Sequence, residues 1–109
     1  MSSVLHKNLA SGRWQELSLV EQLGNIGTEV SRVQRWFNKD KKSYDNAVLR
    51  TLELFDLTLS DSRWKGHLKE IVRTREVFCD IVSGSNEYKS SFEDLEEYFY
   101  HYAFAARNK

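Results

Sequence analysis

The stretch SLVEQLGNIGTEVSRVQRWF, residues 18–37, decides the fold of this chain. Its apolar residues recur at intervals of four and three, which is the spacing of a helix that packs lengthwise against a neighbour. Ser18 followed by Glu21 forms a capping box, which satisfies free backbone N–H groups at a helix start. The charged run at residues 38–42 ends this helix. The predicted apolar face consists of Leu19, Leu23, Ile26, Val30, Val33 and Phe37.

A second helix is predicted over residues 43–59, with Ser43 as its N-cap. A short strand around Thr58 is the competing interpretation, but the whole window follows the helical period and contains no glycine. We therefore favour a helix. Its predicted apolar face consists of Tyr44, Val48, Leu52, Phe55 and Leu59.

A third helix is predicted to begin at Asp61 or Ser62 and to end at Gly84, because glycine commonly terminates helices. A fourth is predicted to begin with a capping box of Ser90 and Glu93. The loop between them is rich in Ser, Gly and Asn. The predicted apolar faces are Trp64, Leu68, Ile71, Phe78 and Val82 in the third helix, and Phe92, Leu95, Phe99, Tyr102 and Ala106 in the fourth.

Four amphipathic helices with short connections predict an all-α fold, an antiparallel up-down-up-down four-helix bundle. We expect the bundle domain to span residues 18–109. Residues 1–17 are expected to form a short extra helix or an extended cap over one end. The length of 109 residues suits one domain, and the absence of proline lets each helix run unbroken.

Composition limits the possible environments of the chain. Hydrophobic residues make up 40% of it, which is too many for a disordered tail, and no apolar run approaches the roughly 18 residues of a membrane span. The single cysteine, Cys79, has no partner for an internal disulfide. The first residues lack the apolar stretch of a signal peptide. We therefore expect a cytoplasmic protein that does not bind membranes.

The charges cancel overall but are segregated along the chain. Residues 32–50 hold six basic and two acidic side chains, and residues 63–75 hold five basic and one acidic, a net charge of +4 in each. Residues 76–97 hold one basic and seven acidic side chains, a net charge of −6. A solvated surface is the simplest interpretation. One alternative is a particle with a basic and an acidic region that self-associates head to tail or docks a charged partner. Another is a basic patch that binds RNA through segments 32–42 and 63–75, with Arg32, Arg35, Lys41, Lys42, Arg63, Lys69 and Arg73.

Arg75 falls at the centre of the predicted apolar face of the third helix, so its guanidinium is expected to face the bundle interior or a groove. A buried guanidinium needs a charged partner. Asp56 and Glu29, on the flanks of the second and first apolar faces, are the candidates. One interpretation is a structural ion pair in this interior polar network, and the other is an anion or nucleotide site that includes Arg32 or Arg73.

Carboxylates three residues apart, Glu53–Asp56 and Glu93–Glu96, resemble the magnesium-binding helices of all-α nucleotide pyrophosphatases. Such a site needs two facing pairs of inward carboxylates, and here Glu53 points away from the apolar face of its helix. A Mg²⁺-dependent nucleotide-processing enzyme with Arg75 is therefore only the second alternative. No histidine or cysteine joins a ligand cluster, so no metal site, no cofactor and no catalytic residue is predicted.

Two glycines interrupt the first helix at positions where each costs about 1 kcal/mol relative to alanine. Close approach of another helix explains Gly24 and Gly27, and small residues at 28 and 31 extend the thin side of the helix. The same side, together with Trp36, also suits a helix–helix seam between subunits.

Three stretches, residues 24–32, 52–64 and 75–80, resemble a group of small microbial helical proteins that have no assigned activity. The resemblance covers most of residues 14–107. It implies a helical bundle and carries no site or mechanism.

The predicted function is a non-enzymatic interaction or assembly module that binds a protein, either itself as a homo-oligomer or another chain. The helical pattern is strong, whereas no group of residues converges on a chemistry. Aromatic side chains off the apolar faces are expected at an interface. These are Trp14, Trp36, Tyr88, Tyr98 and Tyr100.

Overall fold

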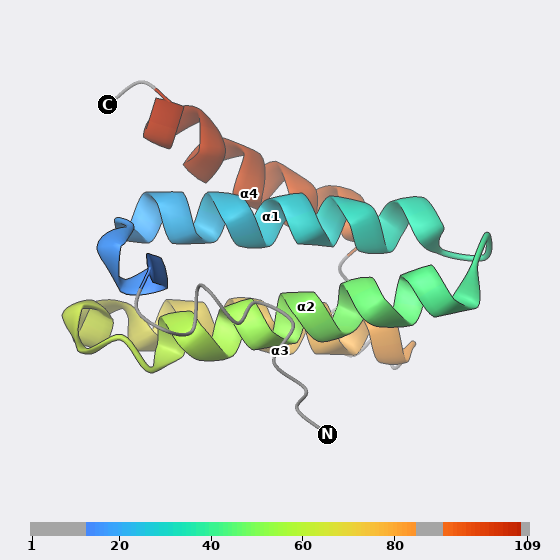
Figure 1. Cartoon of the computed structure of the whole chain (residues 1–109), viewed down its shortest axis with the longest axis horizontal. Coiled ribbons are helices and arrows are strands. Elements are labelled where there is room, and N and C mark those ends of the chain that lie inside the picture. The colour runs from blue at the N-terminus through green and yellow to red at the C-terminus, as the bar shows by residue number, and fades with distance from the viewer. Residues whose placement is uncertain (1–12, 85–90, 108–109) are drawn as a thin grey trace.

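The computed structural model describes residues 13–84 and 91–107, with side chains up to Tyr100 except that of Tyr98. The predicted all-α bundle is confirmed, and the described ranges contain four α-helices and no strand (Figure 1). The predictions for Tyr88, Tyr98, Tyr102 and Ala106 lie outside the described side chains. The elements are η2 (Trp14–Glu16), α1 (Leu19–Trp36), α2 (Lys41–Leu59), η3 (Ser62–His67), α3 (Leu68–Ser83) and α4 (Phe92–Arg107), η marking 3₁₀ turns.

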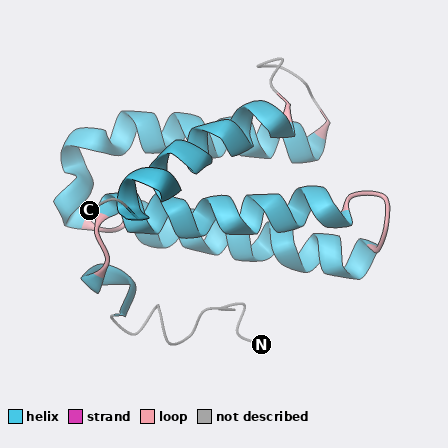
Figure 2. Ribbon diagram, turned by 90° about the horizontal axis from the view of Figure 1, so that it is seen from above, coloured by secondary structure: helices cyan, strands magenta, loops and turns pink. Residues whose placement is uncertain are grey.

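Helix α1 is the central element of the fold. It packs extensively against both α2 and α4, whereas α3 packs mainly on α2. Helices α1 and α2 form an antiparallel hairpin, and α4 crosses α1 obliquely (Figures 1 and 2). Because α4 makes few contacts with α3, the regular up-down-up-down packing stays a prediction.

The helices begin and end where the capping residues in the sequence predict, except at the N-termini of α2, α3 and α4. The capping box of α1 is confirmed: the Glu21 amide donates to Ser18 Oγ at 3.1 Å, and the Ser18 amide donates to Glu21 Oε1 at 2.9 Å. Gly84 ends α3 with φ of 79°, a left-handed conformation that favours glycine.

Ser43 is not the N-cap of α2. Asp40 holds that position, and its carboxylate accepts a hydrogen bond from the Ser43 amide at 3.2 Å, so the helix begins at Lys41. The prediction placed the charged run 38–42 wholly outside the helices. A carboxylate at the N-cap offsets the cost of two lysines in the first turn.

The capping pair of α4 lies one residue later than predicted. The Asp94 amide donates to Ser91 Oγ, and the Ser91 amide donates to Asp94 Oδ2, both at 3.2 Å. The predicted pair of Ser90 and Glu93 is therefore wrong by one position. Two consecutive serines followed by consecutive acidic residues fit both registers, and the sequence does not separate them.

The core is built from residues of all four helices, but its α2 face differs from the prediction. Phe55 is fully buried as expected, and Ala47, Thr51, Leu54 and Thr58 complete the buried face. The threonines tolerate burial because their hydroxyls find partners: Thr51 donates to the Ala47 carbonyl at 2.8 Å. The predicted Tyr44, Val48, Leu52 and Leu59 are partly buried at the flank of the core.

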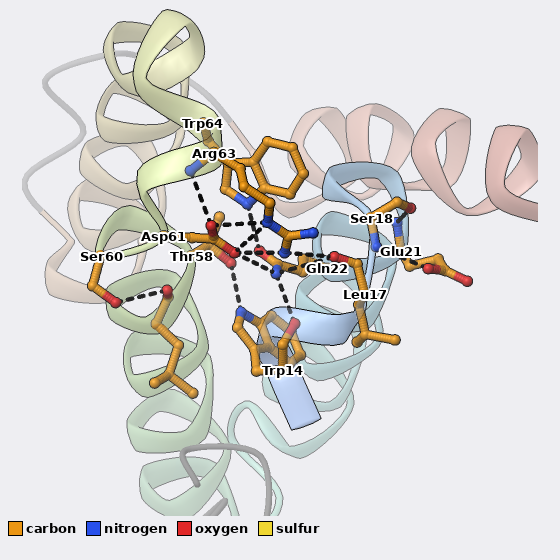
Figure 3. Close-up of polar contacts among 11 residues, drawn as sticks. Trp14, Leu17, Ser18, Glu21, Gln22, Thr58, Ser60, Asp61, Arg63 and Trp64 are labelled. Carbon is orange, nitrogen blue, oxygen red and sulfur yellow. Dashed lines mark hydrogen bonds and ion pairs between the residues drawn. The ribbon is translucent and has the colours of Figure 1, made fainter. Parts of the chain in front are cut away.

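Trp14 anchors the N-terminal segment in the core, so its predicted place at an exposed interface is wrong. Its side chain is fully buried, and its indole Nε1 donates to Thr58 Oγ1 at 3.1 Å (Figure 3). The backbone carbonyl of Trp14 accepts from Gln22 Nε2 at 2.8 Å. The other end of that amide accepts from Trp64 Nε1 at 3.0 Å. One buried glutamine of α1 thus joins η2 to η3.

Residues 62–67 form the 3₁₀ turn η3 instead of the first turns of α3, and Asp61 is its N-cap. The backbone of Trp64 departs from helical geometry at φ −102° and ψ 23°. This departure accompanies the hydrogen bond from its indole to Gln22. A single helix from Asp61 or Ser62 to Gly84 was therefore the wrong prediction.

Asp61 and Arg63 form an ion pair at this end of the bundle, with Arg63 Nη2 2.6 Å from Asp61 Oδ2. Arg63 also donates to the Leu17 carbonyl at 2.8 Å and stacks on the Trp64 ring at 4.3 Å. Arg63 thus ties the N-terminal segment to η3 (Figure 3). It belongs to the structural junction and not to the predicted basic patch.

We expect the junction to make stability depend on acid. The hydrogen bond from Arg63 lowers the pKa of Asp61 to about 2, with further contributions from the Arg63 amide and Gln22, against the opposing effect of burial. The unfolded value is about 3.9, so the stabilisation is complete above pH 4 and is lost as the pH falls toward 2. It is at most about 2 kcal/mol, because the half-exposed Arg63 is screened by water.

Urea unfolding at pH 6 and at pH 2.5 measures how much the free energy of unfolding falls in acid. In Asp61→Asn this fall should be smaller by the contribution of the Asp61 carboxylate. Asp56→Asn, which changes an exposed carboxylate outside the junction, serves as the control for the loss of one negative charge. An Asp61→Asn protein with the full wild-type dependence would contradict the assignment.

Candidate functional site

A groove of about 470 Å³ runs between α1 and α4. The contribution of α1 is a row of small residues, Gly24, Gly27, Thr28 and Ser31. The contribution of α4 is three glutamates and two aromatic residues, Glu93, Glu96, Glu97, Phe99 and Tyr100. We name this feature the α1–α4 groove. Its volume lies within the range of about 300–1,000 Å³ that is typical of ligand pockets.

Gly27 sets the depth of the groove by letting α4 approach α1. A Cβ added at Gly27 would collide with the Cβ of Phe99 and lie 2.9 Å from its Cγ. The ring of Phe99 is buried, with its centroid 6.1 Å from that of Phe55, so it has no room to withdraw. The predicted close approach at Gly27 is confirmed, and the approaching helix is α4 of the same chain. Phe99 of the same chain thus accounts for the glycine at position 27 without a second subunit.

Gly27→Ala is expected to destabilise the protein by about 1–3 kcal/mol through overpacking, even though alanine is about 1 kcal/mol better than glycine in a helix. Urea unfolding measures this change. Gly66→Ala is the matched control, because nothing lies within 4 Å of the added Cβ there, and it should be neutral or slightly stabilising. A Gly27→Ala protein as stable as wild type would show that α4 does not seat against Gly27.

The rim of the groove is acidic. Glu93 and Glu97 are exposed and lie one turn apart on α4. Glu96 is held in place by α1: with its amide nitrogen turned toward the carboxylate, Gln34 donates to the two Glu96 oxygens at 2.9 and 3.0 Å. Tyr100 adds an aromatic side chain that is 60% exposed. The groove therefore has small residues of α1 on one side, which we call its floor, and three glutamates and two aromatic residues of α4 on the other.

The two basic segments lie at opposite ends of the molecule. Residues 35–42 surround the turn between α1 and α2, whereas η3 and the start of α3 lie at the other end of the hairpin (Figure 1). The predicted patch that combines them is therefore not one surface. Arg32 is also engaged, since its Nη1 donates to Glu29 Oε2 at 2.8 Å. Lys69 and Arg73 border a second groove, of about 900 Å³, along α3 with Leu68 and Val72.

We call residues 35–42 the aromatic–basic turn. Trp36 is 36% exposed and Phe37 is 51% exposed, so the predicted core position of Phe37 is only partly correct. One side of the Phe37 ring packs near Tyr44 and Phe92, at centroid distances of 5.9 and 6.5 Å. Trp36 is not among the residues that line the α1–α4 groove, so the groove joins Gly24 and Gly27 but not Trp36. The basic residues of the turn are Arg35, Lys39, Lys41 and Lys42.

Arg75 pairs with Asp56 as predicted, but not in the bundle interior. Its Nε lies 3.2 Å from Asp56 Oδ1, and the Asp56 side chain is 64% exposed. Arg75 Nη1 lies 3.9 Å from Cys79 Sγ. The buried face of α3 is centred on Ile71, Thr74 and Phe78, which turns Arg75 to the boundary with α2. Glu29 is buried elsewhere, on α1 beside Arg32, so the predicted interior network of the three residues is wrong.

We expect Arg75→Met to change the free energy of unfolding by less than about 1 kcal/mol, because ion pairs exposed to water contribute little. Phe78→Ala, at a buried position on the same helix, should lose about 3–5 kcal/mol and serves as the comparison. Thermal and urea unfolding measure both. A loss of about 3 kcal/mol or more for Arg75→Met would mean that the guanidinium is part of a buried pair after all.

Metal and membrane sites find little support among the residues described. In those ranges no three His, Cys, Asp or Glu side chains lie close enough together to hold a metal ion. The carboxylate of Asp56 is paired with Arg75, which competes with the magnesium role considered for Glu53 and Asp56. None of the helices in the described ranges combines the length and hydropathy that crossing a membrane requires.

Comparison with known proteins gave no match: no family model, no curated protein and no solved structure is similar to this chain. The resemblance to small microbial helical proteins stays a prediction. The α1–α4 groove and the aromatic–basic turn are the two candidate functional surfaces of the described residues.

Proposed function

We propose that this chain is a non-enzymatic protein-interaction module whose α1–α4 groove receives a basic segment of a protein partner. The observation that carries the proposal is the composition of the groove: a floor of small residues opposite three glutamates and an exposed tyrosine. Small residues allow close approach of an inserted side chain or helix. Exposed tyrosine is typical of protein interfaces.

Electrostatics defines the partner class. Glu93, Glu96 and Glu97 make a cluster of negative charge on a chain whose sixteen basic and sixteen acidic residues cancel overall. Complementary charge speeds association and selects partners, whereas like charge opposes it. The small and aromatic residues of the groove favour a segment that carries both apolar and basic side chains, such as one face of an amphipathic helix.

The proposal is tested with two synthetic peptides of one amphipathic helical design, one with lysine and one with glutamate on the polar face. We expect the lysine peptide to shift the backbone NMR signals of Gly24, Thr28 and Ser31. In the Glu93→Lys/Glu97→Lys variant its affinity should fall about 10-fold or more. Circular dichroism verifies that the variant stays folded. Signal shifts spread over the whole surface, or an affinity unchanged by the variant, would overturn the proposal.

RNA binding through the aromatic–basic turn is a second candidate, which the exposure of Trp36 and Phe37 beside four basic residues favours. Aromatic side chains next to arginine and lysine stack on unpaired bases and contact phosphates. The turn is short, however, and the second basic segment lies at the other end of the molecule (Figure 1). Protein interaction is therefore the function that we favour.

A further inference from the structure

We infer that the occupant of the α1–α4 groove is the aromatic–basic turn of a second copy of this chain. This inference rests on the proposed function and names its partner. The two surfaces are complementary in charge and in apolar character, and both belong to the same polypeptide. Repetition of the contact would build a reciprocal dimer or a head-to-tail assembly.

The aromatic–basic turn has the shape and chemistry of an inserted element. It lies at the end of the α1–α2 hairpin (Figure 1), where Asn38 reverses the chain with φ of 60°. Trp36 and Phe37 keep 36% and 51% of their surfaces exposed. Arg35, Lys39, Lys41 and Lys42 outnumber Asp40, the N-cap of α2, so the turn carries net positive charge. Lys41 is paired with Asp45 of the same helix at 3.0 Å.

The groove has groups that complement both the lysines and the aromatic rings of the turn. Exposed Glu93 and Glu97 are placed to meet lysines, and the floor of small residues is placed to receive an aromatic ring. Both surfaces exist in the isolated chain, so association requires no refolding. Because the chain carries no net charge at neutral pH, attraction between copies comes from the separation of charge and weakens as salt screens it.

A single copy cannot fill its own groove. Helix α1 carries the residues that line the groove, from Gly24 to Ser31. The aromatic–basic turn lies at the C-terminal end of the same helix. The helix fixes their separation, at a rise of about 1.5 Å per residue. The turn also points away along the axis of the hairpin (Figure 1). The contact must therefore form between molecules and depend on protein concentration.

The test is a charge exchange between the two surfaces, read by light scattering after size exclusion. The turn variant is Lys41→Glu/Lys42→Glu, and acidic residues in the first turn of α2 are compatible with the helix dipole. The groove variant is Glu93→Lys/Glu97→Lys. Lys65→Glu/Lys69→Glu makes the same charge change at the opposite end of the molecule and is the matched control.

In low salt we expect the wild-type mass to exceed 12.8 kDa and to rise with concentration. In about 1 M salt, where the Debye length is about 3 Å, it should return to that of one chain. Each variant alone should associate about 10-fold or more weakly, because like charges then face each other. An equimolar mixture of the two should recover the wild-type association, since each turn again meets a groove of opposite charge. The control should behave as wild type.

Three outcomes would overturn the inference: a wild-type chain that stays a monomer in low salt, a mixture that fails to recover, or a heavy particle with raised absorbance at 260 nm. The last would place a nucleic acid on the turn. If the chain is a monomer but still binds the lysine peptide, the proposed function stands with a foreign partner. If it binds neither the peptide nor itself, both proposals fail.

Discussion

The crossing of α4 over α1 at Gly27 is the constraint on which the rest of the structure depends. Helix α1 packs extensively with both α2 and α4, and the missing side chain at Gly27 lets Phe99 sit against the helix backbone. Phe99 then reaches Phe55 of α2 across the core. The same close approach leaves small residues along the line where the helices diverge, and this line becomes the floor of the α1–α4 groove. Packing and the candidate site thus share one cause.

At the end of the bundle that holds η2 and η3, the packing depends on buried polar groups and not on the close approach of two helix backbones. Gln22 uses both ends of its amide to join the backbone of Trp14 to the indole of Trp64. Asp61 accepts from Arg63 at the edge of this group. Buried polar groups are stable only when they are satisfied, so η2, α1 and η3 must form as a unit. Within the described residues 13–17, Trp14 is therefore part of the core. The rest of the predicted N-terminal segment, residues 1–12, lies outside the described residues.

Charge is arranged differently from what the linear sequence indicates. Residues 32–50 and 63–75 have equal net charge, yet the fold sends their exposed parts to opposite ends (Figure 1) and assigns Arg63 to the structural junction. The acidic segment is likewise divided, and only its α4 part lines the groove. Of the two basic regions, the aromatic–basic turn alone combines exposed aromatic residues with positive charge. The aromatic–basic turn and the α1–α4 groove are the two surfaces that the proposed interaction uses.

The sequence by itself determined the all-α class, the central helix with its capping box at Ser18, the end at Gly84 and the close approach at Gly27. These features follow from local periodicity, capping chemistry and the absence of a side chain. Only the tertiary structure decided that Trp14 is buried, that Arg75 is partly buried at the boundary with α2 and which face of α2 enters the core. A residue off an apolar stripe is buried only when another segment covers it, and the covering segments here lie about 40 residues away, as Thr58 does from Trp14.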